Sequence, residues 1–193
     1  MLFFVSDLSA PNNKLCKLEL LNFSANFPTI GISQLTKVAA AYFSGSGTTS
    51  TTAASVIEGV VAAGAEILDA RIIGEDIIED QRQSDQLATR LDERDAIIFG
   101  TPTFIGSVSG QLKTFFDAMA PRWFTQKWRN KVAVGFTASS LAAGDKAGAF
   151  TAISAFVMQM DMIWVGTGAG FQENMNTNGF YLGLAQLLQP RSS

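Results

Sequence analysis

The stretch that decides the fold is Ser44-Gly45-Ser46-Gly47-Thr48-Thr49-Ser50, which stands between the apolar run Val38–Phe43 (VAAAYF) and the helix-like segment Thr51–Ala63. Glycine lets the backbone curl so that several N–H groups face one point, and the hydroxyl side chains add further donors. The following helix contributes the positive end of its dipole. A strand, this loop and a helix in succession therefore predict an anion cradle suited to a phosphate, without a lysine or arginine in the loop.

Strand-like and helix-like segments alternate regularly from Lys37 onward. The further apolar runs of strand length are Glu66–Ile72, Ala96–Gly100, Val132–Phe136 and Met162–Gly166. The helical segments between the strands are Thr51–Ala63, Ser84–Arg94, Ser109–Ala120 and Ala147–Met160. Regular alternation of this kind predicts a doubly wound α/β fold, in which helices cover both faces of a parallel sheet.

Local features refine these helix assignments. The first helix is expected to bury the face formed by Ala54, Ile57, Val60 and Val61. The third helix is expected to bury Leu112, Phe115, Phe116 and Met119. Ser84 is the expected N-cap of the second helix, and Pro121 is the expected stop of the third. Phe180–Leu188 indicates a short final helix, and the usual full helix after the last strand is missing.

Two further loops follow the third and fourth predicted strands. In Gly100–Gly110, Pro102 and Gly106 flank the apolar residues Phe104 and Ile105, whereas Thr137–Lys146 is small and rich in hydroxyls. Because the carboxyl ends of parallel strands meet at one edge of a sheet, these loops and the phosphate cradle should converge. Free amides and apolar side chains at such an edge predict a site for a flat heteroaromatic ring beside the phosphate.

The composition excludes several kinds of site. The chain has 193 residues, 47% of them hydrophobic, and its single cysteine, Cys16, allows no intrachain disulfide and favours a reducing cytoplasm. With no histidine, neither a Ser-His or Cys-His catalytic pair nor an imidazole metal site can form. The apolar runs are too short to span a membrane, and the opening residues lack the pattern of a signal peptide. The chemistry is therefore expected to come from a borrowed cofactor.

Three other interpretations remain open at this stage. Gly45 and Gly47 match two glycines of a dinucleotide-binding fingerprint, and Asp69 lies where a ribose-binding carboxylate would be expected. The basic, aromatic segment Arg122–Lys131 suits stacking on single-stranded nucleic acid, or packing beneath the sheet or against a neighbouring subunit; the net charge of −3 favours packing. Asp145 and Lys146 could contact substrate or form an exposed ion pair, which is the simpler interpretation.

Three motifs carry a resemblance to a known family. They are Ser44-x-Ser46-Gly47-Thr48-Thr49, Pro102-Thr103-Phe104-Ile105-Gly106 and Gly110-Gln111-Leu112-Lys113-x-Phe115-x-Asp117. From about Lys37 to Leu188 the chain resembles the flavodoxin-like NAD(P)H:quinone oxidoreductases of the WrbA type and related FMN reductases. The resemblance implies a five-stranded parallel sheet of order 2-1-3-4-5 in three α/β/α layers, FMN as cofactor, and NADH or NADPH as electron donor.

The resemblance also implies the cofactor-binding residues. The FMN phosphate would be held by Ser44, Ser46, Gly47, Thr48 and Thr49. The isoalloxazine ring would be lined by Pro102, Thr103, Phe104, Ile105 and Gly106. Its other edge would be bordered by Thr137, Ala138, Ser139, Ser140 and Gly144. Members of the family often have a histidine in the third loop, which this chain lacks, and a basic and an aromatic residue where it has Phe104 and Ile105.

The expected function is that of an enzyme in which NAD(P)H reduces FMN and the electrons pass to a quinone or a similar small acceptor. No side chain is expected to act as a catalytic acid or base. The alternative is a non-enzymatic electron carrier of the flavodoxin type. Such a carrier docks on its partners through a strongly charged face, and a net charge of −3 is weak for that task.

The chain is expected to comprise an N-terminal extension, residues 1–36, which adds no strand to the main sheet, and an FMN-binding domain, residues 37–193. The missing final helix should leave an apolar face bare, which favours a homo-oligomer, a dimer or a tetramer. Neither nucleic-acid binding nor membrane insertion is expected, and the cytoplasm is the expected location.

Overall fold

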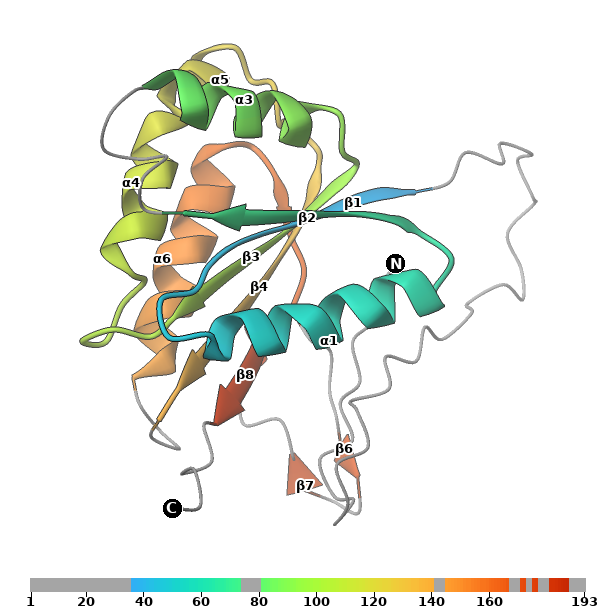
Figure 1. The fold of residues 1–193 in the computed structure, drawn as a ribbon, viewed down its shortest axis with the longest axis vertical. Coiled ribbons are helices and arrows are strands. Elements are labelled where there is room, and N and C mark those ends of the chain that lie inside the picture. The colour runs from blue at the N-terminus through green and yellow to red at the C-terminus, as the bar shows by residue number, and fades with distance from the viewer. Residues whose placement is uncertain are drawn as a thin grey trace.

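The centre of the molecule is a parallel sheet of order β2-β1-β3-β4-β5, as the sequence predicted (Figure 1). The computed structural model describes residues 36–73, 81–140, 145–166, 171–172, 175–176 and 181–187. The strands of this order are β1 (Lys37–Phe43), β2 (Glu66–Ile72), β3 (Ala96–Pro102), β4 (Val132–Ser139) and β5 (Ile163–Trp164). A separate two-stranded antiparallel sheet joins β6 (Phe171–Gln172) to β7 (Met175–Asn176).

Helices cover both faces of the sheet. They are α1 (Thr48–Ala62), α3 (Gln81–Asp92), α4 (Gly110–Ala118), α5 (Ala120–Phe124) and α6 (Lys146–Gln159). Figure 1 shows α1 on one side of the strands and α4 and α6 on the other. The result is the expected three-layer α/β/α arrangement.

The central strand β1 is buried on both faces, which is why it contains three successive alanines. Val38, Ala40 and Tyr42 belong to the core cluster beneath α1, whereas the alternate residues of the strand face the second, larger cluster beneath α4 and α6. In that larger cluster the rings of Phe116 and Phe156 stack with their centroids 3.8 Å apart. Burial of aromatic side chains of this size contributes on the order of 2–3 kcal/mol each, so this cluster fixes how α4 and α6 lie on the sheet.

The fifth position of the sheet is divided between two short strands. β5 pairs only with Val132 and Ala133, while β8 (Leu184–Leu187) pairs in parallel with the second half of β4, Phe136–Ser139. The short helix expected at Phe180–Leu188 is therefore wrong. The physical reason is that the second half of β4 would otherwise leave its backbone N–H and C=O groups unpaired, and a strand satisfies them whereas a helix cannot.

The buried face of α1 also differs from the expectation. Ala54 and Val61 are exposed, and the helix instead buries a face that carries Thr49, Thr52, Ala53, Val56, Gly59 and Val60. Threonine enters this face because Thr52 Oγ1 donates to the carbonyl of Thr48 within the helix, 3.3 Å away, so that its methyl group can pack inward. Because threonine was counted as polar, the buried face of α1 was predicted about one residue too far toward the C-terminus of the helix.

Two expected helix boundaries are corrected as well. Ser84 lies inside α3, which begins at Gln81, so it is not the N-cap. Pro121 lies in the first turn of α5, where proline needs no hydrogen-bonded N–H, and it therefore opens a helix and is not simply a stop. The expected burial of Leu112, Phe115, Phe116 and Met119 is confirmed.

The expectation for the N-terminal extension lies outside the described residues, apart from Thr36, and the proposed domain division stays a prediction. None of the helices in the described ranges is long and apolar enough to cross a membrane.

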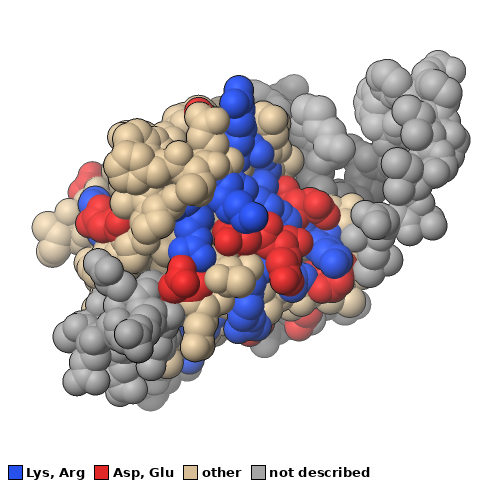
Figure 2. Space-filling model, turned by 90° about the horizontal axis from the view of Figure 1, so that it is seen from above, with Lys and Arg blue, Asp and Glu red and all other residues tan. Residues whose placement is uncertain are grey.

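The basic, aromatic segment Arg122–Lys131 is held against α3 by carboxylates. Arg122 forms ion pairs with Asp85 and Asp92, and Trp128 Nε1 donates to Asp92 Oδ1 over 2.6 Å. Trp128 is fully buried in the larger core cluster, which confirms the expected packing of this ring beneath the sheet. Figure 2 shows basic and acidic side chains lying side by side on the face seen from above.

Candidate functional site

Three loops meet at the carboxyl edge of the sheet. β1 pairs with β3 and β3 pairs with β4, so that Tyr42 lies opposite Gly100 and Thr101 lies opposite Thr137. The segments that follow these strands are therefore neighbours, as the sequence predicted. The switch point of the topology, where α/β sheets of this kind bind ligands, lies between β1 and β3.

The first loop has the backbone geometry of an anion cradle. Gly47 is the N-cap of α1, and its φ of 93° is a left-handed conformation that favours glycine. Its carbonyl oxygen accepts a hydrogen bond of 3.1 Å from the N–H of Thr51, which is the first bond of the helix. Ser44 Oγ accepts from the N–H of Ser50 over 3.1 Å. No acceptor among the described residues is recorded for the N–H groups of Ser46, Gly47, Thr48 and Thr49. Several donors of one loop and the N-terminus of α1 are therefore available to a ligand.

One further observation tests whether this loop fits a phosphate. The first turn of α1 carries no acidic side chain that would repel an anion. The buried hydroxyl of Ser50 lies against the phenol of Tyr42, whose pKa it lowers, and is therefore engaged within the protein. The N–H groups of the loop and the N-terminus of α1 are the groups that fit a phosphate.

An arginine that sequence reasoning missed reaches this loop from the neighbouring strand. Arg71 Nη2 donates to the carbonyl oxygen of Ser44 over 2.9 Å. Arg71 lies opposite Tyr42 in the parallel register of β1 and β2, one residue before the end of β2. The loop itself contains no basic residue, and this register brings a cation to it from β2.

Tyr42 lies beneath α1 beside the same loop. Burial raises the pKa of its phenol, and the negative charge of Asp69 raises it further. Asp69 is opposite Ala40, three residues before the end of β2, so it lies along the strand and not at the ligand edge. Dinucleotide-binding folds place the strands in the order 3-2-1-4-5-6, whereas this sheet has the order 2-1-3-4-5. The dinucleotide interpretation of Gly45, Gly47 and Asp69 is therefore wrong.

The second loop forms a tight hairpin at the end of β3. Phe104 and Ser107 exchange both backbone hydrogen bonds, of 3.0 and 3.1 Å, with Ile105 and Gly106 at the tip. Both tip residues have positive φ, 46° and 74°, as the two central residues of a type I′ turn require. The Ile105 side chain is fully exposed and that of Phe104 is half exposed. This hairpin presents two apolar side chains at the ligand edge, together with the N–H groups of Ile105 and Gly106, which have no acceptor within the described ranges.

A network of threonines fixes the strand ends behind this hairpin. Thr137 Oγ1 donates to the carbonyl of Thr101 over 2.8 Å and lies 2.8 Å from Thr103 Oγ1. Thr101 Oγ1 accepts from the N–H of Ser109, whose own side chain caps α4. Thr137 is fully buried, so its hydroxyl connects β3 to β4. Of the third group of predicted residues, Thr137, Ala138 and Ser139 belong to strand β4 and not to a loop, because β8 extends the pairing of that strand.

At the third loop, Ser140 is exposed and Ser139 is almost buried, while Gly144 lies outside the described residues. Lys146 is only 1% exposed, so the expected exposed ion pair with Asp145 is wrong. Burial lowers the pKa of the Lys146 ammonium group. Lys146 begins α6, whose first turn packs against the second-loop hairpin, so this buried lysine is near the predicted site.

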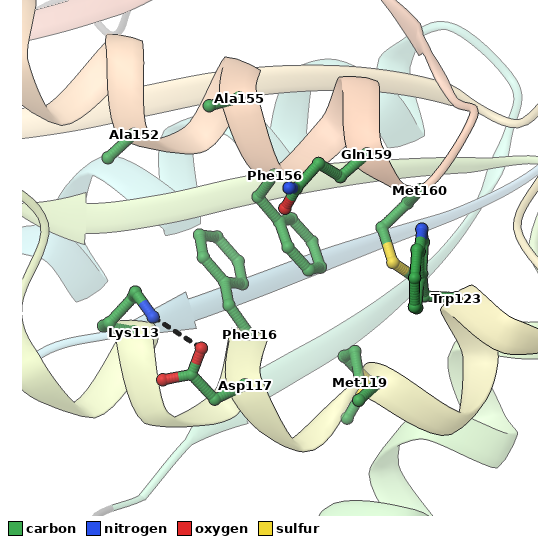
Figure 3. Close-up of a pocket in the computed structure, with 11 residues that line it drawn as sticks. Lys113, Phe116, Asp117, Met119, Trp123, Ala152, Ala155, Phe156, Gln159 and Met160 are labelled. Atoms are coloured by element: carbon green, nitrogen blue, oxygen red, sulfur yellow. Dashed lines mark hydrogen bonds and ion pairs between the residues drawn. The ribbon is translucent and has the colours of Figure 1, made fainter.

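A groove of about 470 Å³ lies elsewhere, on the outer side of the helices that cover the opposite face from α1. Figure 3 shows it between α4 and α6, with Phe116 and Phe156 at its base and the Lys113–Asp117 ion pair at its rim. None of the residues predicted to bind the cofactor lines this groove. It is therefore a separate surface feature.

Residues 36–175 match the model of the NADPH-dependent FMN reductase family. The chain belongs to this family. The match covers β1 to β6, and hence the three loops of the ligand edge.

Similar proteins carry related names. Flavodoxin FldP of Pseudomonas aeruginosa is 35% identical over 69% of this chain and 67% of its own length. An NAD(P)H dehydrogenase (quinone) of Rhizobium johnstonii is 30% identical over 74% of this chain and 77% of its own length. The crystal structure of a flavodoxin, WrbA-like protein from Agrobacterium tumefaciens has a TM-score of 0.62 and 31% identity, and covers 79% of this chain and 83% of that one.

Family membership fixes the general chemistry. This member of the NADPH-dependent FMN reductase family is an FMN-dependent oxidoreductase with NAD(P)H as electron donor, as the sequence predicted. The structural fit of the first loop to a phosphate agrees with FMN as the cofactor.

Proposed function

We propose that this enzyme passes electrons from NADH or NADPH through FMN to a quinone or a similar small acceptor. The observation that carries the proposal is the convergence of a phosphate cradle, an apolar hairpin and the end of β4 at one edge of the sheet. Relatives named NAD(P)H dehydrogenase (quinone), at about 30% identity, support the choice of acceptor.

The proposed binding residues are those of the three segments. The phosphate would be held by Ser44, Ser46, Gly47, Thr48 and Thr49, whose loop offers the free N–H groups. The ring would lie against Pro102, Thr103, Phe104, Ile105 and Gly106. The other side of the ring would be bordered by Thr137, Ala138, Ser139, Ser140 and Gly144, of which Thr137 is buried in β4 with its hydroxyl already bonded to Thr101.

FMN, when bound, supplies the hydride-accepting N5 position of its ring. The protein's part is placement. The N–H groups of Ile105 and Gly106, to which the described part of the chain offers no acceptor, would donate to polar atoms of the ring and so stabilise negative charge that develops on it. The exposed side chains of Phe104 and Ile105 would exclude water from the bound ring. No acid or base is required of a side chain, which suits a chain without histidine.

Anaerobic stopped-flow absorbance of the FMN-loaded protein tests this function. NADH or NADPH should bleach the flavin band in a single two-electron phase, and added benzoquinone should restore it. The rate should show no titration near pH 6.5 from an enzyme imidazole.

One observation favours a second candidate, because a relative at 35% identity is named a flavodoxin. A carrier of that kind would oxidise nicotinamide negligibly and would exchange single electrons with a protein partner at rates that fall steeply with salt. Such a result in the same experiment would show that the protein is an electron carrier and not an enzyme, and the proposed FMN site would be unaffected.

We also propose that the chain forms a homo-oligomer, with a second copy of the chain on the groove between α4 and α6. After Lys146, helix α6 has no charged side chain, although Ala155, Met158 and Gln159 are exposed on it. A surface helix ordinarily carries charges on its outer face. About a two-fold axis at the rim, Lys113 of one copy would face Asp117 of the other.

Light scattering of the purified protein at micromolar concentration checks this assembly. Ala155→Arg should give a monomer, because it places a charge in the uncharged groove. Ala54→Arg makes the same change on the exposed side of α1 and should leave the assembly unchanged. A wild-type monomer would contradict the proposal. The cytoplasm remains the proposed location, on the basis of the single cysteine.

A further inference from the structure

We propose that Arg71 is a specificity-determining residue that makes the cofactor site selective for the phosphate of FMN over uncharged flavin. The inference rests on the proposed assignment of the Ser44–Ser50 loop as the phosphate cradle. It adds to that cradle a cation from a different strand, β2, which no motif of the loop contains.

The contact that places Arg71 is specific. Its Nη2 donates to the carbonyl of Ser44, the residue at which β1 ends and the cradle begins. Ser44 is almost fully buried, and its side chain accepts from the N–H of Ser50 in the first turn of α1. One residue therefore connects Arg71 to the start of the loop by its backbone and to the start of the helix by its side chain.

The guanidinium has donors to spare. Its contact with Ser44 uses one of five N–H groups, and no ion pair between Arg71 and a described carboxylate is recorded. Asp69 is the acidic neighbour on the same face of β2; its charge raises the pKa of Tyr42, whereas the charge of Arg71 lowers it. A guanidinium fork can hold a carbonyl and a phosphate oxygen at once, which a lysine ammonium does less well.

The charge is needed because the rest of the cradle is neutral. The first turn of α1 has no charged side chain, so backbone N–H groups, hydroxyls and the helix dipole are the loop's own means of binding an anion. The whole chain carries a net charge of −3, which opposes the approach of a dianion. A cation bonded to the loop offsets this electrostatic repulsion locally. It should therefore strengthen the binding of flavins that carry a phosphate and leave the binding of the ring unchanged.

A purely structural role would give a different pattern. If Arg71 only braced the loop, its loss would distort the loop for every flavin and would not depend on salt. The electrostatic role predicts instead that FMN and riboflavin respond differently, since riboflavin has the same ring and lacks the phosphate.

The experiment measures the dissociation constants of FMN and riboflavin for the apoprotein by flavin fluorescence, at 50 and 300 mM salt. Arg71→Gln keeps a donor for the Ser44 carbonyl and removes the charge. It should weaken FMN binding about ten-fold at low salt, leave riboflavin binding within two-fold, and flatten the salt dependence of FMN binding. Arg71→Lys should keep the salt dependence with a smaller loss. Arg90→Gln, on the exposed side of α3, makes the same charge change and should alter neither ligand.

Equal losses for FMN and riboflavin, or an unchanged FMN affinity in Arg71→Gln, would overturn the proposal. Equal binding of FMN and riboflavin by the wild type would overturn it together with the cradle assignment. Failure of the proposed turnover would look different: nicotinamide would not be oxidised, while the FMN-to-riboflavin ratio would still depend on Arg71. Thermal melting of each apoprotein shows whether a variant folds, and the lysine variant keeps the test decisive if the glutamine variant does not.

Discussion

A β-carbon at Gly148 would lie 1.9 Å from the carbonyl oxygen of Gly106. The first turn of α6 therefore packs directly on the backbone of the hairpin that follows β3. The two backbones are so close at this point that no residue with a β-carbon fits at position 148. Because Gly106 is a tip residue of that hairpin, this packing fixes the proposed ring-binding loop against a helix from a later part of the chain.

Gly148→Ala should therefore disturb the hairpin. We expect a loss of about 1–3 kcal/mol in the free energy of unfolding, as for other overpacked sites, and weaker FMN binding. Urea denaturation and flavin fluorescence measure the two effects. Gly110→Ala is the matched control, because its β-carbon would meet nothing within 4 Å and alanine suits the start of a helix. Equal behaviour of the two variants would contradict the close packing.

Ile105→Gly should raise stability and lower flavin affinity. A β-branched residue at φ 46° is strained, and its fully exposed side chain buries nothing in return. Glycine removes that strain, so the free energy of unfolding should rise by about 0.5–1 kcal/mol after its own entropy cost. The loss of an apolar contact should weaken FMN binding several-fold. A variant that is less stable than the wild type would show that the isoleucine is not strained.

Gly47→Asp should abolish FMN binding, because it adds a negative charge in the phosphate cradle. Gly47→Asn controls for shape. Asparagine tolerates φ 93° better than other residues, and a β-carbon there meets nothing within 4 Å, so this variant should fold and bind FMN with reduced affinity. Melting curves with and without excess FMN give the answer, since a ligand at 100 times its dissociation constant raises stability by about 2.7 kcal/mol. A large FMN-dependent shift in the aspartate variant would rule out the cradle.

Tyr42 should make the stability of the wild type fall at high pH. Burial and Asp69 raise the pKa of its phenol above the usual 10.0, so between pH 10 and that raised value the folded state holds a proton that the unfolded state has released. The associated stability is present below pH 10 and is lost as the pH rises through the folded-state pKa. Tyr42→Phe should lack this loss. Urea denaturation at pH 8 to 11 compares the two, and parallel curves would disprove the shift.

Much of the fold was open to prediction because it depends on local patterns. Glu66–Ile72 was predicted with the bounds that β2 has, since a short apolar run between turn residues has few alternatives. The loop after β1 was recognised by its glycines, hydroxyls and place before a helix.

What could not be predicted depends on pairing between distant parts of the chain. Arg71 reaches Ser44 only because the parallel register of β1 and β2 places it opposite Tyr42, and no motif encodes that register. Leu184–Leu187 becomes a strand because half of β4 needs a partner, which its own sequence does not reveal. The burial of Lys146 likewise depends on where α6 meets the sheet.

The divided fifth position of the sheet has a consequence for solubility. A sheet that ends in a long, regular edge strand can recruit a strand from another chain and begin aggregation. Here that edge consists of a two-residue strand, β5, and a four-residue strand, β8, so neither offers a continuous row of donors and acceptors to a newcomer. The opposite edge, β2, carries the exposed charged residues Glu66, Asp69 and Arg71. Both edges of the sheet therefore disfavour the addition of another strand: the β5 and β8 edge because it is divided into two short strands, and the β2 edge because it is charged.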